Sequence, residues 1–279
     1  MTVGIAGLGL IGGSIAKAYK NGGQHTVYGF DIDNSVLGFA KLSGAVDGTL
    51  DADTIPLCDC IFIAVYSGAA IAYLESIASA VLTHTVIIDC CGTKRDLCAA
   101  CFAIAESNGF TFVGGHPMAG TQHSGFGHSS ATLFSGASMI IVPPRFDDIA
   151  LINHIKILLE PLRLKKITVT NAKKHDEIIA FTSQMAHIIS NAYVKSPTAQ
   201  VHSGYSAGSY KDLTRVACLN EEMWTDLFFE NKDNLIKELD IFINSVTEYR
   251  EALEAENRDM MKQLLSDGRR CKEEADGKC

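Results

Sequence analysis

Residues 2–14 read TVGIAGLGLIGGS, and this stretch decides the fold of the chain. An apolar run leads into Gly7, and Gly9 and Gly12 complete a Gly-x-Gly-x-x-Gly pattern. In the dinucleotide-binding turn of a Rossmann fold, the first glycine allows a tight turn and the second lets the backbone approach a pyrophosphate. The third lets the following helix pack closely on the strand. The pattern therefore predicts a nucleotide site at residues 7–12.

The residues around the glycines support this interpretation. Leu10 and Ile11, within the motif, are expected to contact the cofactor. A helical stretch over residues 15–19 follows, and the free N–H groups at the helix start would face the phosphates. The strand expected at residues 26–30 ends at Asp31, where an acid hydrogen-bonds the adenosine ribose and repels a 2′-phosphate. We therefore predict NAD rather than NADP as the cofactor. The alternative is a glycine-rich turn in some other α/β protein.

Composition and charge limit the kind of protein this is. The 279 residues are enough for two domains or one large one, and 47% of them are hydrophobic, so a full core is available. The formal net charge of −8 argues against a nucleic-acid or anionic-membrane surface. The sequence contains no signal peptide and no apolar run of about 18 residues, so we expect a cytoplasmic protein without a membrane span.

The nine cysteines are expected to be free thiols, because no secretion signal accompanies them. Cys98 and Cys101 have the spacing of a metal or redox pair. However, they fall within an expected helix among alanines, and no partner set has the spacing of a zinc site. We favour small buried side chains and predict no metal site.

Strands and helices alternate through residues 1–171, which predicts a Rossmann-like α/β domain with a doubly wound parallel sheet. The run CIFIAV at residues 60–65 is apolar at every position, as expected for a strand that is buried on both faces. The other expected strands are 85–89, 110–114, 138–142 and 166–170, and the expected helices are 35–43, 69–82, 95–108 and 147–161.

The pattern changes in residues 172–279, where no strand-like run occurs and we predict an all-α helical domain. We expect one long helix over residues 172–194, two more between residues 221 and 265, and a frayed tail over residues 268–279. Apolar residues recur at the three- and four-residue steps of a buried helix face at Leu235, Leu239, Phe242, Ile243 and Val246.

The second informative stretch is GGHPMAGTQHSG, residues 114–125. It follows an expected strand at its carboxyl end, the edge where ligands bind in open α/β sheets. Glycines and a proline around His116 predict a loop that leaves the imidazole accessible. A histidine with a pKa near neutrality is a natural acceptor for the proton released when a hydroxyl is oxidised by hydride transfer. His116 is therefore the candidate general base, and the alternative is a loop histidine that caps the strand.

Thr93 and Lys94 follow the carboxyl end of the expected strand at residues 85–89. Thr93 can donate to a substrate oxygen or to His116, or it can cap the helix that begins near Arg95. Lys94 is suited to pair with a phosphate or a carboxylate.

The helical half contributes two further candidates. Arg215 is suited to bind a substrate carboxylate through two hydrogen bonds, or to form an exposed ion pair with Asp212. His187 lies among apolar neighbours on the long helix, where a histidine is more often a core residue than a functional one.

Together these motifs resemble the prephenate/arogenate dehydrogenase family, whose enzymes make tyrosine precursors. The resemblance runs through nearly the whole chain in one order, and it combines HPMAG with KDLTR behind the dinucleotide motif. The matching segments are GLGLIGGS (7–14), Asp89 with Lys94, HPMAG (116–120) with Ser124-Gly125, Leu133-Phe134, KDLTR (211–215), Met223-Trp224 and Glu230-Asn231-Lys232.

The resemblance implies an NAD-dependent oxidative decarboxylation, in which prephenate loses hydride from C4 and CO2 from C1 to give 4-hydroxyphenylpyruvate. His116 matches the residue that takes the proton of the C4 hydroxyl, and Arg215 matches the residue that grips a substrate carboxylate. A homodimer of helical domains is implied, which leaves open whether Arg215 serves its own site or that of its partner. The implied catalytic residues are His116, Thr93 and His187, and the substrate-binding residues are Thr121, Gln122, Gly208, Asp212 and Arg215.

The chain departs from the family pattern at three places. Gly92 stands where a serine is usual, so the hydroxyl that bonds the substrate or His116 comes from Thr93 or is absent. The tripeptide QMA at residues 184–186 replaces a more usual His-Leu-Pro. Gln122 stands where a glutamate is usual, and a neutral side chain there favours prephenate, because a carboxylate would attract the ammonium group of arogenate.

Three alternatives follow from these residues. The first is an arogenate-preferring or dual-substrate enzyme of the same family. The second is a dehydrogenase of the β-hydroxyacid type, which uses a lysine on the long helix, but Lys173 and Lys174 come too early and HPMAG would be unexplained. The third is a non-catalytic NAD-binding sensor, which would bind the cofactor without turning over a cyclohexadienyl substrate.

Overall fold

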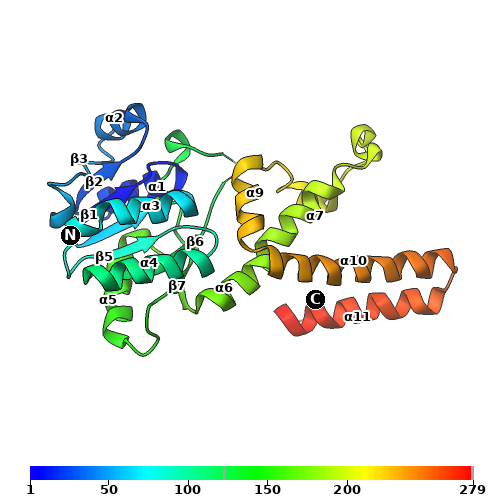
Figure 1. Cartoon of the computed structure of the whole chain (residues 1–279). Coiled ribbons are helices and arrows are strands. Elements are labelled where there is room, and N and C mark those ends of the chain that lie inside the picture. The colour runs from blue at the N-terminus through cyan, green and yellow to red at the C-terminus, as the bar shows by residue number, and fades with distance from the viewer. Residues whose placement is uncertain (122, 278–279) are drawn as a thin grey trace.

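Eight strands of the described part of the chain form one sheet, in the order β3-β2-β1-β4-β5-β6-β7-β8 (Figure 1). The structure is a computed structural model, and it describes residues 1–121 and 123–277. Neighbouring strands are parallel except β6 and β7, which run antiparallel. The strands are β1 (Thr2–Ala6), β2 (Thr26–Phe30), β3 (Gly48–Thr49), β4 (Cys60–Ile63), β5 (Val86–Asp89), β6 (Thr111–Met118), β7 (Ser138–Val142) and β8 (Lys166–Val169).

Helices cover both faces of this sheet, as predicted for a doubly wound α/β fold. The antiparallel β7 was not predicted. A parallel neighbour needs a crossover connection, usually a helix, and between β6 and β7 the described residues form only the 3-10 turn Phe126–His128. The short β3 was also missed, since two residues carry no hydropathy pattern. The helices of this half are α1 (Leu10–Asn21), α2 (Asn34–Leu42), α3 (Ser67–Ile77), α4 (Arg95–Asn108) and α5 (Ile149–Leu159).

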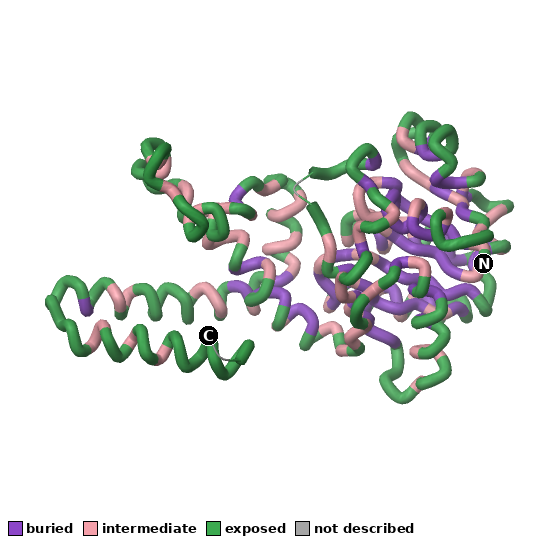
Figure 2. The backbone as a smooth tube through the Cα atoms, turned by 180° about the vertical axis from the view of Figure 1, so that it is seen from behind, coloured by how far each residue is buried: buried purple, intermediate pink, exposed green. Residues whose placement is uncertain are grey.

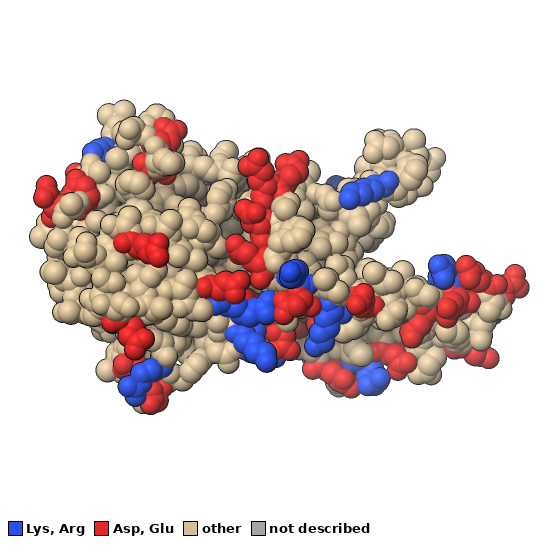
Figure 3. Space-filling view, in the orientation of Figure 1, with Lys and Arg blue, Asp and Glu red and all other residues tan. Residues whose placement is uncertain are grey.

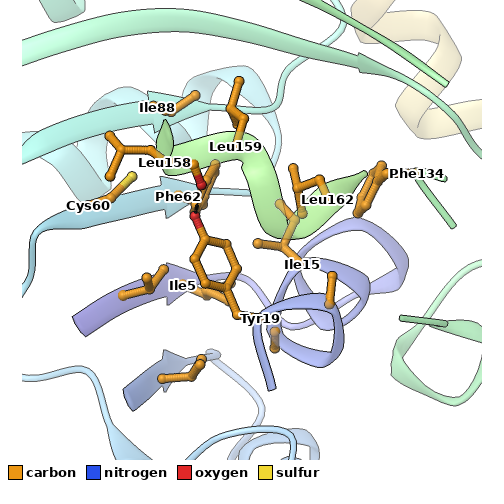
Figure 4. Close-up of a cluster of buried hydrophobic side chains, with 14 of the residues drawn as sticks. Ile5, Ile15, Tyr19, Cys60, Phe62, Ile88, Phe134, Leu158, Leu159 and Leu162 are labelled. Atoms are coloured by element: carbon orange, nitrogen blue, oxygen red, sulfur yellow. Dashed lines mark hydrogen bonds between the residues drawn. The ribbon is translucent and has the colours of Figure 1, made fainter. Parts of the chain in front are cut away.

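The strands bury alternate side chains against opposite helical layers. On one face Ile5 and Phe62 pack with α1 and α5, and on the other Ile61 packs with α3 and α4. Figure 4 shows the first of these clusters around Tyr19, whose hydroxyl donates a hydrogen bond to the carbonyl oxygen of Leu158. This layering fixes the strand ends, and therefore the loops that carry the candidate site residues.

The second half of the chain is helical, as predicted, but three helices rather than two begin between residues 221 and 265. The expected long helix is present without a break. It consists of α6 (Ala172–Ile179), a π-helical segment at Ala180–Met185 and α7 (Ala186–Tyr193). The expected frayed tail is wrong. The helix α11 extends to Asp276, and ion pairs one turn apart, such as Arg270 with Glu274, support a solvated helix there. The remaining helices are α8 (Gly208–Thr214), α9 (Glu221–Glu230), α10 (Lys232–Glu254) and α11 (Arg258–Asp276).

Two long helices, α10 and α11, form an antiparallel arm that extends away from the sheet (Figure 1). Figure 2 shows that buried residues concentrate in the α/β half and that this arm is mostly exposed. The sequence predicted a buried face on α10, and Leu235 is buried. In the single chain, however, the prediction is wrong for three residues of that face, because Phe242, Ile243 and Val246 are exposed. Phe242, Ile243 and Val246 therefore form an exposed apolar stripe on α10. Within the described residues, no helix has both the length and the apolar character needed to cross a bilayer.

Candidate active site

The predicted nucleotide turn connects β1 to α1, and each glycine has the environment that its role requires. Gly7 has φ +86°, and a Cβ there would lie 2.6 Å from the Ala64 carbonyl oxygen. A Cβ on Gly12 would lie 1.8 Å from the Gly7 carbonyl oxygen, so α1 approaches the turn only because residue 12 lacks a side chain. A Cβ on Gly9 would meet nothing within 4 Å, so the backbone is open to a pyrophosphate. The turn fits a dinucleotide.

Asp31 follows β2 and lies beside this turn. Its carboxylate accepts hydrogen bonds from the backbone N–H groups of Leu8, at 2.7 Å, and Asp33, at 3.0 Å. Because Leu8 belongs to the glycine turn, Asp31 is held where the adenosine ribose lies in Rossmann folds. Leu10 and Ile11 are the first residues of α1, whose first turn carries no acidic side chain, as suits an anion-binding helix start.

The helical half is anchored over the carboxyl end of β5. Asp176 of α6 accepts the backbone N–H groups of Lys94, at 2.8 Å, and Arg95, at 2.9 Å. The Arg95 guanidinium in turn pairs with Asp233 of α10 and donates to Asn231 at 3.2 Å. Figure 3 shows charged side chains of both signs gathered where the two halves meet. The ligand-binding edge of the sheet is therefore covered by helices of the second half.

His116 lies at this edge, but the prediction that it sits in a loop is wrong. It belongs to β6, where it is paired with Ile140 of β7, and it is half-buried. Its Nδ1 lies 2.9 Å from Nε2 of His175. Burial lowers the pKa of His116 well below its usual value, and the neighbouring His175 and Lys94 act in the same direction. A neutral imidazole can accept a proton, which is what a general base requires.

Lys94 does not have the role that its position predicted. Its ammonium group pairs with the Asp89 carboxylate, and both side chains are fully buried. Asp89 also accepts the backbone N–H groups of Cys91 and Gly115, each at 2.8 Å. The pair therefore ties β5 to β6 beneath the site, and Lys94 is not available to a phosphate or a substrate carboxylate.

Thr93 is buried, and its hydroxyl donates to the carboxylate of Glu230 on α9. The same carboxylate accepts from the Ser67 hydroxyl at 3.0 Å. The structure gives Thr93 no capping hydrogen bond, since the first N–H groups of α4 are accepted by Asp176. Glu230 was not among the predicted site residues, although it lies in a segment that matches the family. It links the start of α3 to the loop after β5.

His187 lies on α7 under the ring of Trp224, with ring centroids 4.0 Å apart. A carbonyl oxygen can only accept, so the 2.8 Å contact between His187 Nδ1 and the Ser183 carbonyl makes Nδ1 the donor and leaves Nε2 as an acceptor. Burial lowers the pKa of His187, and the charge of Arg215 adds to this effect. The structure therefore brings His187 and Arg215 within electrostatic range, while Trp224 was missed as a site residue.

The other predicted substrate residues that the structure describes are exposed. Gly208 and Asp212 are exposed residues of α8, and exposed Arg215 follows its last residue. The Thr121 hydroxyl donates to the carbonyl oxygen of His123 at 2.9 Å. Gln122 lies outside the described residues.

Two departures from the family pattern are accommodated by one residue of α9. A Cβ on Gly92 would lie 2.9 Å from Cδ2 of Leu227, so Leu227 fills the space in front of the glycine. The Leu227 carbonyl oxygen accepts from Nε2 of Gln184 at 2.7 Å. Gln184 is buried, and its carbonyl oxygen accepts from Asn231 at 2.8 Å. These contacts give Gln184 a packing role between helices.

The cysteine pair behaves as the buried-thiol interpretation predicted. Cys98 and Cys101 are free and buried in α4. Burial raises the pKa of Cys101 to about 12, and the charge of Asp89 adds to this effect. Thiols held protonated in this way are poor metal ligands and weak nucleophiles.

A glycine turn shaped for a dinucleotide, an acid at the ribose position and a neutral histidine at the carboxyl edge of the sheet define a dinucleotide-dependent dehydrogenase with a helical second half. Residues 15–168 match the nucleotide-binding domain of prephenate dehydrogenase, and residues 171–267 match its dimerization domain. The chain belongs to the prephenate dehydrogenase family and is an oxidoreductase of tyrosine biosynthesis.

Characterised relatives agree with this assignment. Prephenate dehydrogenase of Bacillus subtilis is 29% identical over 269 residues, which cover 92% of this chain and 71% of that protein. Cyclohexadienyl dehydrogenase of Zymomonas mobilis is 28% identical over 271 residues, 93% of this chain and 90% of that protein. The crystal structure of A. aeolicus prephenate dehydrogenase with hydroxyphenyl propionate and NAD+ has a TM-score of 0.84 and 25% identity, and covers 99% of this chain and 98% of that one.

Proposed function

We propose that this chain is a prephenate dehydrogenase, which converts prephenate and NAD to 4-hydroxyphenylpyruvate, CO2 and NADH. The observation that carries the proposal is the position of His116 at the carboxyl edge of the sheet, where burial lowers its pKa, in a chain that belongs to this family. Burial keeps its imidazole free to take a proton, and the helical half covers this edge of the sheet.

NAD is the cofactor of this chain. The nucleotide-binding domain of the family is present, its turn is open at Gly9, and Asp31 lies at the ribose position. The A. aeolicus relative was solved with NAD+. When bound, NAD accepts the hydride that leaves the substrate.

His116 takes the proton of the C4 hydroxyl as hydride leaves C4. Loss of CO2 from C1 aromatises the ring, which makes the overall step strongly favourable. The protein mainly has to position the reacting groups and accept the proton. Arg215, which directly follows α8, binds a substrate carboxylate, and the charge of Arg215 acts on His187. Asp212 and Gly208, both on α8, also contribute to substrate binding. Thr93, in the loop after β5, supplies a hydroxyl oxygen near the substrate. Glu230 orients this hydroxyl by accepting its hydrogen bond.

Prephenate is preferred over arogenate because Gln122, which follows Thr121 in the sequence, carries no charge. The competing function is a cyclohexadienyl dehydrogenase that accepts both substrates. The name of the Zymomonas relative favours it, since that protein is similar over 93% of this chain.

The chain acts as a homodimer whose helical domains pair. The exposed apolar stripe of α10 supports this, as does the match to the family's dimerization domain. The proposed domain boundary lies between residues 171 and 172, where α6 begins after β8. A cytoplasmic location stays a prediction from the sequence.

The deciding experiment follows NADH absorbance with purified protein, NAD and either prephenate or arogenate. We expect turnover of prephenate that falls by about 100-fold or more in His116→Asn, the range a positioned general base contributes. Gln122→Glu is expected to raise turnover of arogenate relative to prephenate. Turnover of arogenate alone would discard the specificity argument and keep the family. Absence of turnover with either substrate, while NAD still binds, would refute the enzymatic proposal in favour of a sensor.

A further inference from the structure

Hydrogen bonds link His116 to Asp176 through His175. Nδ1 of His116 lies 2.9 Å from Nε2 of His175, and Nδ1 of His175 lies 2.7 Å from the Asp176 carboxylate. His175 and Asp176 are each 1% exposed. His175, at the start of the helical half, therefore contacts the imidazole on β6, and Asp176 contacts the other ring nitrogen of His175.

The direction of each hydrogen bond follows from the chemistry of the groups. An ionised carboxylate only accepts, so Nδ1 of His175 carries a hydrogen. A neutral imidazole carries one hydrogen, so Nε2 of His175 is an acceptor. Nδ1 of His116 is then the donor in the 2.9 Å contact. A neutral His116 held in this way keeps its lone pair on Nε2.

The surroundings keep both imidazoles neutral. Burial is the largest cause that lowers the pKa of each histidine, and the charge of Lys94 acts in the same direction. Asp176 and Asp89 oppose this effect at His175, but its pKa stays below the usual value. Lys94, Asp89 and Asp176 are the charged groups that act on the pair.

We propose that His175, oriented by Asp176, is a positioning residue that holds His116 in the tautomer whose Nε2 accepts the substrate proton. The proposal rests on the proposed function, because it takes His116 as the proton acceptor. The hydrogen bond made by one ring nitrogen decides which nitrogen stays unprotonated. A base in the wrong tautomer presents a hydrogen to the substrate and cannot accept its proton.

A purely structural role is the competing explanation. Asp176 accepts the first N–H groups of α4 and pairs with Arg95, so changes at Asp176 would also loosen the junction between the halves. The test therefore changes His175, whose side chain contacts His116 and Asp176.

The direct measurement is long-range ¹H–¹⁵N NMR of histidine-labelled protein without substrate, with the His116 signals assigned by their loss in His116→Asn. We expect His116 to be protonated at Nδ1 in the unmodified chain. His175→Asn can still donate to Asp176 but is too short to reach His116, so the hydrogen is expected to move to Nε2. His175→Gln keeps an oxygen acceptor at the distance of the lost Nε2, and the Nδ1–H tautomer is expected to persist.

Kinetics provide the second readout. His175→Asn is expected to lower kcat about 100-fold with an unchanged KM, and His175→Gln to retain most of the activity. Protonation of His116 at Nε2 in the unmodified chain, persistence of the Nδ1–H tautomer in His175→Asn, or equal loss of kcat in both variants would overturn the proposal.

The two readouts separate this proposal from the proposed function. The NMR measurement needs no turnover, so an inactive chain with the expected tautomer would refute the dehydrogenase reaction alone. An active chain with the opposite tautomer would refute the role of His175 alone. NAD titration and thermal unfolding check that each variant is folded. The unmodified chain and His175→Gln decide the question even where His175→Asn does not fold.

Discussion

Lys94 and Asp89 form an ion pair with both side chains fully buried beneath the candidate site. Removing one partner leaves an uncompensated charge in the interior, because Asp89 would retain only the N–H groups of Cys91 and Gly115. We expect Lys94→Met to lower the free energy of unfolding by about 3–5 kcal/mol in urea titrations. The control is Lys20→Met, which breaks the exposed pair with Asp47 and is expected to cost at most about 1 kcal/mol. Equal losses in the two variants would contradict this prediction.

Two glycines of the nucleotide turn are expected to separate stability from cofactor binding. Gly12→Ala places a Cβ 1.8 Å from the Gly7 carbonyl oxygen, so it should lower the free energy of unfolding by about 1–3 kcal/mol or more. Gly9→Ala has open space and an ordinary φ of −71°, so stability should be retained while NAD affinity falls about tenfold. Thermal unfolding and a fluorescence titration with NAD measure the two effects. A Gly9→Ala variant that binds NAD normally would show that the open space does not receive the pyrophosphate.

Asp31 is expected to set the preference for NAD over NADP. Its carboxylate is held beside the glycine turn, where it would repel a 2′-phosphate. Asp31→Ser should raise the affinity for NADP relative to NAD by about tenfold or more, measured by titration with both cofactors. Asp53→Ser removes an exposed charge elsewhere and should leave the ratio unchanged. An unaltered ratio in Asp31→Ser would place the ribose away from this residue.

His116 and His175 predict a stability that depends on pH. In the folded chain the pKa values of His116 and His175 lie below the ordinary value of 6.5, so near that pH the unfolded chain binds protons that the folded chain does not. Their contribution is therefore fully present above pH 6.5 and is lost as the pH falls below it. The slope is at most about 1.4 kcal/mol per pH unit for each histidine.

Urea unfolding between about pH 7.5 and pH 5.5 measures this slope. His175→Gln is expected to flatten it, whereas His154→Gln, on the exposed side of α5, serves as the control. An identical slope in the unmodified chain and in His175→Gln would rule out a contribution from His175.

The apolar stripe on α10 is expected to bury itself against a second copy of the chain. Ile243 is 57% exposed on the arm, so Ile243→Glu should place a charge in the interface and shift sedimentation toward the monomer. Asn244→Glu is the control, because Asn244 is exposed and lies about 160° around the helix from both Phe242 and Val246. If Ile243→Glu still forms dimers at low concentration, the dimer interface lies elsewhere on the chain.

The order of strands and helices follows from local sequence patterns, and so does the nucleotide turn. Separate roles for Gly7, Gly9 and Gly12 follow from their short, fixed spacing, although the backbone that crowds Gly7 is that of Ala64, which only the tertiary structure brings there. The alternation of apolar strands with helices predicts the sheet for the same reason. The antiparallel β7 lies beyond such patterns, since strand direction depends on the connection rather than on the strand itself.

The candidate base was predicted by sequence, but its setting was not. His116 stands in a conspicuous motif, whereas His175 and Asp176 follow two lysines at the start of a helix and look like part of a solvated face. Only packing of the helical half on the sheet buries them and brings His175 to His116. The same packing directs Thr93 to Glu230, which are 137 residues apart in the sequence.

The sequence by itself determined the fold class, the cofactor turn, the candidate base and the family, because these depend on residue types at short, fixed spacings. Tertiary structure alone decided which partner each polar side chain meets. It buried Lys94 against Asp89 and left the apolar stripe of α10 open. Hydrogen-bond partners and burial depend on which distant segments meet in space, and no local spacing records that.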